Sequence, residues 1–182
     1  TEEMNNNANT VLKGLKESGD KLIAIAPGSV WFTKKWPTEY YKKLSELLVN
    51  NNYAVVLIGS SDENDICNTV MPNRKSINLA GKLSLLESAA IISKCDLMVC
   101  NDSGALHIAN AMQTDVFAFF GPTVQSIGYF PFGKNDFVFE IEMECRPCGS
   151  HGGNTCPLKH HSCMRDILPE SVIKKVKEKF GE

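Results

Sequence analysis

Residues 96–107 have the sequence Asp-Leu-Met-Val-Cys-Asn-Asp-Ser-Gly-Ala-Leu-His, in which an apolar segment is followed by a polar turn and the start of a helix. Residues 96–100 are expected to form a strand, because Leu97 to Cys100 are a short apolar run without alternation, which is typical of a strand buried on both faces of a sheet. A polar turn follows, and the pattern from Gly104 to residue 112 predicts a helix. Asp102 or Ser103 can cap that helix, because both side chains accept hydrogen bonds from backbone N–H groups. A buried strand joined by a tight turn to a helix is the repeating unit of a parallel α/β sheet.

Strand and helix patterns alternate in the same way on both sides of this stretch. Further apolar strands are expected at residues 22–26, 53–58, 77–79 and 116–120, with helices at residues 37–50, 62–71 and 84–93. Asp62 can cap the second of these helices, and Ser84 with Glu87 forms a capping box for the third. A further strand is expected at residues 137–141 and a terminal helix at residues 169–181. The order predicts an α/β fold with a Rossmann-like, doubly wound parallel sheet.

The length of 182 residues suits one domain with a short extension. We expect residues 1–20 to form a polar helical linker between domains, with Val11, Leu12 and Leu15 on its apolar side. Residues 21–182 then form the domain, and residues 145–165 are a cysteine-rich loop within it. The net charge of −2 argues against a nucleic-acid partner.

Cysteine usage and hydropathy indicate the compartment. Residues 1–9 are polar and lack the apolar core of a signal peptide, and no stretch approaches the roughly 20 apolar residues of a membrane span. Seven cysteines are an odd number for a disulfide framework, and Cys67, Cys95 and Cys100 fall in an expected helix and at the two ends of an expected strand. Buried, reduced cysteines are common there, so we expect the reducing cytosol.

Small residues follow the expected strands at the points where each strand ends. The turns are Pro27-Gly28-Ser29, Gly59-Ser60-Ser61, Ala80-Gly81, Asn101-Asp102-Ser103-Gly104 and Gly121-Pro122-Thr123. Ligands of an open parallel sheet bind outside the carboxyl ends of its strands, where small residues allow close backbone approach. The sequence contains neither G-x-G-x-x-G nor a G-K-[ST] loop, which argues against a dinucleotide dehydrogenase and a P-loop NTPase. A nucleotide or sugar-phosphate site at this edge is therefore expected.

Two segments carry the candidate chemistry. Ser103 and Gly104 can offer backbone N–H groups to a phosphate at the start of a helix, and His107 lies one turn further on the same face. Lys34 can neutralise the charge of a departing diphosphate. The alternative interpretation is a capping pair with a structural histidine, and a solvated lysine pair beside a core tryptophan.

The sequence resembles the bacterial lipopolysaccharide heptosyltransferases of glycosyltransferase family 9, specifically their carboxyl-terminal half. The resemblance rests on the order and spacing of Pro27-Gly28-Ser29, Lys34-Lys35-Trp36-Pro37, Leu57-Ile58-Gly59-Ser60, residues 79–85, residues 101–107 and Phe120-Gly121-Pro122-Thr123. The cysteine pattern after residue 145 is similar to the heptosyltransferase II branch. The resemblance implies one half of a GT-B enzyme, the donor-binding domain of an inverting glycosyltransferase. It would transfer heptose from ADP-L-glycero-D-manno-heptose to the inner core of lipopolysaccharide.

The resemblance also implies roles for individual residues. It assigns Ser29 and Val30 to the phosphate or sugar, Lys34, Ser103 and Gly104 to the diphosphate, Asp62 to the ribose, Leu83 to the adenine, Asp102 to the heptose hydroxyls and His107 to the edge of the site. The catalytic base and most of the contacts to the acceptor, the lipid A–Kdo core, are expected in an amino-terminal domain that we expect this chain to lack. We therefore expect the chain alone to bind the donor without transferring its sugar. We expect the protein in the cytoplasm, where it can make peripheral contact with the inner face of the inner membrane.

The cysteine-rich loop allows two interpretations. Cys145, Cys148, Cys156 and Cys163 are four thiols, which is the ligand number of a structural tetrahedral zinc site. Their spacing is irregular, however, and a compact loop with reduced cysteines and no metal ligand is the interpretation that we favour.

Three functions remain open at this stage. The first is donor binding for heptosyl transfer, and the second is a GT-B domain that uses another nucleotide sugar. The third is a non-enzymatic α/β interaction domain held together by zinc.

Overall fold

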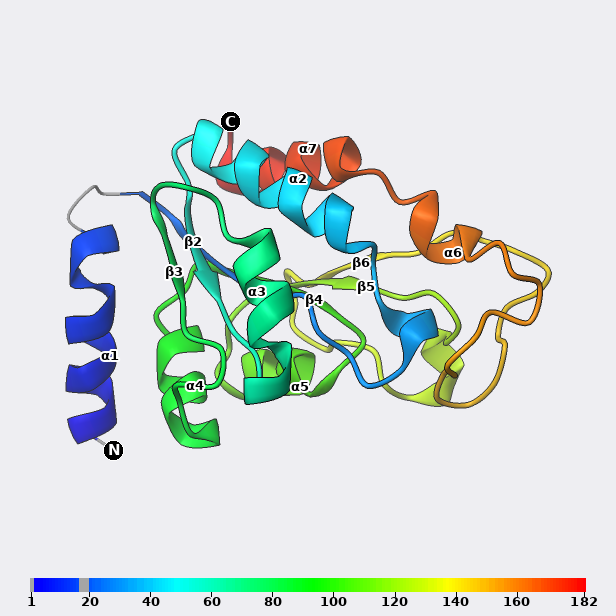
Figure 1. The fold of residues 1–182 in the computed structure, drawn as a ribbon, viewed down its shortest axis with the longest axis horizontal. Helices are drawn as coiled ribbons and strands as arrows, with labels where there is room; N and C mark the ends of the chain where they lie inside the picture. The colour runs from blue at the N-terminus through cyan, green and yellow to red at the C-terminus, as the bar shows by residue number, and fades with distance from the viewer. Residues whose placement is uncertain (1, 17–19) are drawn as a thin grey trace.

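The computed structural model describes residues 2–16 and 20–182, and its centre is one six-stranded parallel sheet (Figure 1). The strand order is β3-β2-β1-β4-β5-β6. The strands are β1 (Leu22–Ala26), β2 (Ala54–Leu57), β3 (Ser76–Asn78), β4 (Leu97–Asn101), β5 (Val116–Phe119) and β6 (Phe137–Phe139). The expected Rossmann-like, doubly wound fold is thus confirmed, with the segment near residue 137 as the sixth parallel strand beside β5.

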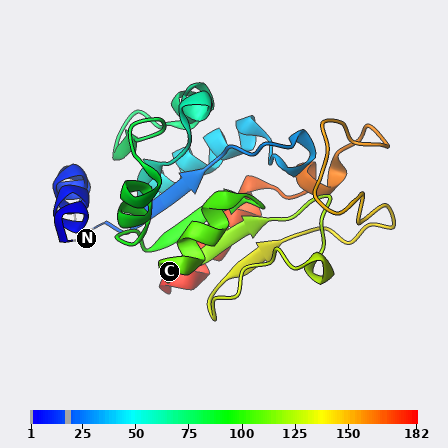
Figure 2. The same cartoon turned by 90° about the horizontal axis from the view of Figure 1, so that it is seen from below.

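Successive side chains of each strand point to opposite faces of the sheet, so both faces present apolar side chains. Helices cover both of these faces. Ile23 and Ile25 of β1 pack toward α2 (Thr38–Asn50), α3 (Asn64–Val70) and α7 (Pro169–Phe180). The opposite face is covered by α4 (Leu85–Ile92) and α5 (Gly104–Ala111), and α1 (Glu2–Lys16) packs on α4 at one side of the sheet (Figure 2). The remaining short helices are η1 (Phe32–Lys34), η2 (Ser61–Glu63), η3 (Gln125–Ile127) and α6 (Ser162–Arg165).

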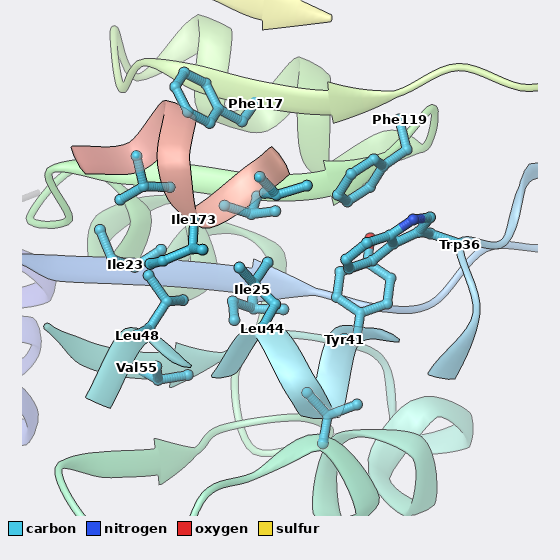
Figure 3. Packing of buried hydrophobic residues seen from close by; sticks show 14 of the residues in the cluster. Ile23, Ile25, Trp36, Tyr41, Leu44, Leu48, Val55, Phe117, Phe119 and Ile173 are labelled. Atoms are coloured by element: carbon cyan, nitrogen blue, oxygen red, sulfur yellow. The ribbon is translucent and has the colours of Figure 1, made fainter. Parts of the chain in front are cut away.

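Trp36 anchors the segment that joins β1 to α2. Its indole stacks on Phe119 with ring centroids 4.2 Å apart, and Tyr41 meets it edge-on at 4.9 Å (Figure 3). The indole Nε1 donates to the carbonyl oxygen of Ile167 at 2.9 Å, so this fully buried ring leaves no polar atom without a partner. The turn that carries Lys34 is thereby fixed against the core.

The helix expected at residues 62–71 has a different start. Ser60 and Glu63 form a capping-box pair in which the Ser60 N–H donates to Glu63 Oε2 at 2.8 Å. Asp62 lies exposed inside η2, and α3 begins only at Asn64. The expected cap by Asp62 is therefore wrong, because Ser60 precedes a glutamate three residues later and takes that role. The second expected capping box, Ser84 with Glu87 at the start of α4, is confirmed.

The amino-terminal segment is helical, as expected, and packs on α4. Ala8 and Leu12 are its buried residues, whereas Val11 points away and is 39% exposed. The apolar stripe thus follows a spacing of four residues through Ala8 and Leu12 rather than through Val11. The assignment of residues 1–20 as a linker stays a prediction, and residues 17–19 lie outside the described part of the chain.

Candidate functional site

The turns after β1, β2 and β3 lie together at the carboxyl edge of the sheet. A side chain at Gly28 would meet the carboxylate of Glu63, so the Glu63 side chain occupies the space that glycine leaves where these two turns meet. The N–H of Gly81 donates to the carbonyl oxygen of Gly59 at 3.0 Å, which joins the turns after β2 and β3. Gly81 has a positive φ of +71°, and its backbone packs against Ser61. The small residues of these turns leave the backbone accessible at this edge, so a ligand can approach it closely here.

Asn101, the last residue of β4, connects the turn after β1 with the start of α2. Its side-chain amide Nδ2 donates to the carbonyl oxygens of Pro27 and Gly28 at 2.9 and 3.0 Å. Its Oδ1 accepts from the Trp36 N–H at 2.9 Å and from the Tyr41 hydroxyl at 3.0 Å. All four bonds are buried, so Asn101 fixes both turns in one arrangement.

Lys34 and Asp102 form a buried ion pair next to these turns. Lys34 Nζ lies 2.5 Å from Asp102 Oδ2, and the two side chains are only 9% and 3% exposed. The hydroxyl of Thr123, which follows β5, donates to the same carboxylate oxygen at 2.7 Å. The ring of Tyr129 lies 5.2 Å from Lys34 Nζ, a distance at which an aromatic face attracts a cation. One cation and one anion are thus held in fixed positions at the edge of the sheet.

The start of α5 lies directly after Asp102. Ser103 occupies the N-cap position without any side-chain bond to the helix, and the carboxylate of Asp102 is engaged by Lys34 and Thr123. The expected side-chain capping by Asp102 or Ser103 is therefore wrong. The first N–H groups of a helix have no intrahelical acceptor, and the space around the missing side chain of Gly104 is open. This helix start can accept an anion, and His107 is exposed one turn away.

The other candidate residues lie at or near the same edge with different exposure. Ser29 is half-buried, whereas Val30 is 85% exposed. Leu83 is half-buried against the core on the α4 side. Asp62 is exposed, and the carboxylate that faces Gly28 belongs to its neighbour Glu63. The functional roles of all these residues stay predictions.

Arg146 is a structural residue of the site that the sequence interpretation missed. Its side chain is 4% exposed and carries a guanidinium that donates to the carbonyl oxygens of Gly121, Ile141 and Thr123, and to the carboxylate of Glu140 at 2.8 Å. These bonds hold the turn that presents the Thr123 hydroxyl to Asp102. Asn101 and Thr123 were also missed as positioning residues, although both stand in quoted motifs, because their partners are far away in the sequence.

The cysteine-rich loop packs against the segment that carries Lys34. The N–H of Thr33 donates to the carbonyl oxygen of Gly153 at 3.0 Å, and the N–H of Gly153 donates to the Thr33 hydroxyl at 2.8 Å. His161 Nε2 lies 2.9 Å from the carbonyl oxygen of Thr33. The loop is therefore the outer support of η1, opposite Asp102.

The thiols of this loop differ in their protonation. Burial, with a smaller contribution from the nearby Cys148, raises the pKa of the Cys163 thiol to about 11. Burial also acts to raise the pKa of Cys156, but backbone N–H groups, that of His161 foremost, point at its sulfur and lower the pKa overall. All four cysteines of the loop are free. Within residues 2–16 and 20–182, no three His, Cys, Asp or Glu side chains are arranged to hold a metal ion.

In the part of the chain that the structure describes, no helix is both long enough and apolar enough to cross a bilayer.

The sequence is similar to a known protein family and to several of its members. The sequence model of glycosyltransferase family 9 (heptosyltransferase) matches residues 2–160. Lipooligosaccharide heptosyltransferase 2 of Campylobacter jejuni is 31% identical over 169 residues, covering 89% of this chain and 52% of that protein. The chain thus spans about half the length of the curated relatives that it matches.

Solved structures share the fold. The structure of Escherichia coli ADP-heptose lipopolysaccharide heptosyltransferase II matches with a TM-score of 0.79 and 24% identity, over 98% of this chain and 51% of that one. The E. coli heptosyltransferase WaaC with ADP-2-deoxy-2-fluoro heptose matches with a TM-score of 0.65 and 20% identity, over 94% of this chain and 47% of that one. At these identities the likeness supports the fold alone.

Proposed function

Because this chain belongs to glycosyltransferase family 9, the heptosyltransferases, we propose that it is the donor-binding part of an inverting glycosyltransferase. The proposed donor is ADP-L-glycero-D-manno-heptose, and the proposed acceptor is the lipid A–Kdo inner core of lipopolysaccharide. The proposed compartment is the reducing cytosol at the membrane face, which suits the free thiols of Cys67 and Cys100.

The observation that carries the proposal is the ion pair between Lys34 and Asp102 beside the start of α5. A sugar nucleotide presents a negatively charged diphosphate next to uncharged hydroxyl groups. The Lys34 ammonium and the N–H groups at Ser103 and Gly104 are suited to the diphosphate, whereas the Asp102 carboxylate can accept hydrogen bonds from hydroxyls. His107 would add a donor at the edge. A cation and an anion held side by side match that alternation of charge.

The nucleoside would extend along the edge toward β2 and β3. We assign its ribose to a carboxylate of the η2 turn, where Glu63 faces Gly28 and Asp62 lies in solvent. Leu83 would contact the base, and Ser29 with Val30 the phosphate or sugar. The preference for adenine draws support from the WaaC structure, which contains ADP-2-deoxy-2-fluoro heptose.

The reaction would be a single displacement at the anomeric carbon. The acceptor oxygen forms the new glycosidic bond while the bond from the anomeric carbon to the diphosphate oxygen breaks, and its electron pair leaves with ADP. Lys34 would stabilise the charge that develops on that oxygen, an effect worth about 2.7–4 kcal/mol for one preorganised donor. The acceptor hydroxyl gives its proton to a base, which we assign to the part of the relatives that this chain does not span.

Thermal unfolding with ADP, UDP and GDP tests the proposal on the chain as it is. ADP at 100 times its dissociation constant should add about 2.7 kcal/mol and raise the Tm by roughly 5–10 °C. The variant Lys34→Met should lose most of this shift. Stronger stabilisation by UDP or GDP would favour a different nucleotide sugar. No shift with any of the three at millimolar concentration would contradict nucleotide binding and favour an interaction domain.

A further inference from the structure

A cavity of about 660 Å³ lies beside the donor edge, between η1, the start of α2, α3 and the cysteine-rich loop. Its lining includes Phe32, Lys35, Ile66, Lys159 and Arg165, and none of the residues assigned above to the donor. The volume is within the range of roughly 300–1,000 Å³ that small-molecule sites occupy. The cavity is therefore large enough for a second ligand.

The charges around this cavity are mainly positive. Lys35, Lys159 and Arg165 contribute three cations, and Glu39 is the one carboxylate of the lining. Arg165 Nη2 lies 3.8 Å from Glu39 Oε1, which is a weak, exposed contact. Across the described ranges 2–16 and 20–182, neither Lys35 nor Lys159 has an ion-pair partner. Two cations thus remain available for an anion.

The cysteine-rich loop contributes polar groups to the lining of this cavity. The backbone N–H groups of residues 158–161 gather around the sulfur of Cys156, which lines the cavity. His160 Nδ1 accepts a hydrogen bond from the Ser162 N–H at 3.0 Å, so its Nε2 is the ring nitrogen left for a ligand.

Part of the cavity lining is apolar. Phe32 is 49% exposed, and its ring packs on the His161 ring with centroids 5.0 Å apart, which holds it in place. Pro37 and Ile66 belong to the same apolar part of the lining. A flat, fixed aromatic ring beside charged groups suits a molecule that has an apolar C–H face and an anionic substituent, as a sugar phosphate does.

The cavity and the donor edge are separated by a single turn of chain. Lys34 and Lys35 are consecutive, so their Cα atoms are about 3.8 Å apart. Lys34 pairs with Asp102 at the donor edge, whereas Lys35 lines the cavity on the other side of η1. A ligand in the cavity would therefore sit next to the donor without competing for Lys34.

We propose that this cavity binds the phosphate group of a phosphorylated saccharide, through Lys35, Lys159 and Arg165, as a subsite for the acceptor. The saccharide ring stacks on Phe32, and the phosphate lies among the cations. The role of this ligand as acceptor rests on the proposed glycosyl transfer. Its binding does not, because binding of a sugar phosphate is measurable without any donor.

The test is a two-dimensional NMR titration of the ¹⁵N-labelled chain with glucose 6-phosphate, inorganic phosphate and glucose. Glucose 6-phosphate should shift the amide signals of residues 32–35 and 158–161, inorganic phosphate should shift them with weaker affinity, and glucose should not shift them. Lys35→Gln and Lys159→Gln should each weaken glucose 6-phosphate binding about tenfold, which is typical of a lost charge-assisted hydrogen bond. Lys43→Gln, an exposed lysine on α2 outside the cavity, is the matched control and should change nothing.

Three results would overturn the proposal. One is an unchanged affinity in both cavity variants, and another is an equal loss in the Lys43→Gln control. The third is a set of shifted amides confined to residues 102–107, which would put the phosphate at the donor edge instead. A parallel titration with ADP separates this proposal from the donor proposal. Failure of ADP to bind contradicts donor binding alone, whereas failure of glucose 6-phosphate contradicts the cavity alone.

Discussion

The ion pair between Lys34 and Asp102 can be tested by removing its charges one at a time and then together. Asp102→Ala leaves the Lys34 ammonium with only 9% of its side chain exposed and no carboxylate beside it. An uncompensated charge of that kind typically lowers the free energy of unfolding by about 3–5 kcal/mol. Lys34→Met leaves a carboxylate with Thr123 as its remaining side-chain donor and should cost about 3 kcal/mol.

The double variant Lys34→Met/Asp102→Ala should be far more stable than the sum of the single losses. Replacing both members of a buried pair by uncharged residues removes the unpaired charge, so we expect a coupling energy of about 2 kcal/mol. The assay is urea unfolding followed by tryptophan fluorescence, since Trp36 is buried against the core. The coupling should change little between low and high salt, because buried pairs are weakly screened. Additive losses below about 1 kcal/mol each would refute the buried pair.

Three further predictions concern single residues. Ser84→Ala should lower the free energy of unfolding by about 1 kcal/mol through loss of the cap on Glu87 N–H, whereas Ser88→Ala in the same helix should cost less in the same urea titration. Thr123→Val should cost about 1–2 kcal/mol, and Thr123→Ser should restore most of it, because only the hydroxyl bond to the carboxylate is at stake. The alkylation of Cys156 by iodoacetamide should reach half its maximal rate at a lower pH than that of Cys148, as measured by mass spectrometry, because backbone N–H groups lower the pKa of Cys156 whereas burial raises that of Cys148. The reverse order of reactivity would contradict this assignment.

The fold followed from local patterns because each pattern has a local cause. Apolar runs without alternation predict strands covered on both faces, and the four central strands of the sheet, β2, β1, β4 and β5, are runs of this kind. The capping box at Ser84 was found because its two residues are three apart. Ser60 and Glu63 have the same S-x-x-E spacing, but Asp62 is also a residue type that caps helices. Two candidate caps two residues apart cannot be told apart by residue type alone, and the structure uses Ser60.

The residues of the candidate site could be predicted from the sequence, but the contacts between them could not. Lys34 and Asp102 were each candidates on their own, yet nothing in the sequence pairs two residues 68 positions apart. The same holds for Asn101 and Arg146, whose partners are backbone oxygens of distant turns. Local patterns carry no information about such bonds, because they form only when the sheet brings its turns to one edge.

The measurement that tests the donor site most directly is calorimetric titration of ADP-heptose and of ADP into the chain and its Asp102→Asn variant. Asparagine keeps an oxygen for the Thr123 hydroxyl and removes the charge, and Asp65→Asn on the exposed side of α3 is the control. If Asp102 holds the sugar hydroxyls while Lys34 and the start of α5 hold the diphosphate, ADP-heptose should lose about tenfold in affinity, the usual cost of a lost charged hydrogen bond. ADP should change less than about threefold. Equal losses for the two ligands, or none for either, would contradict this division of the site.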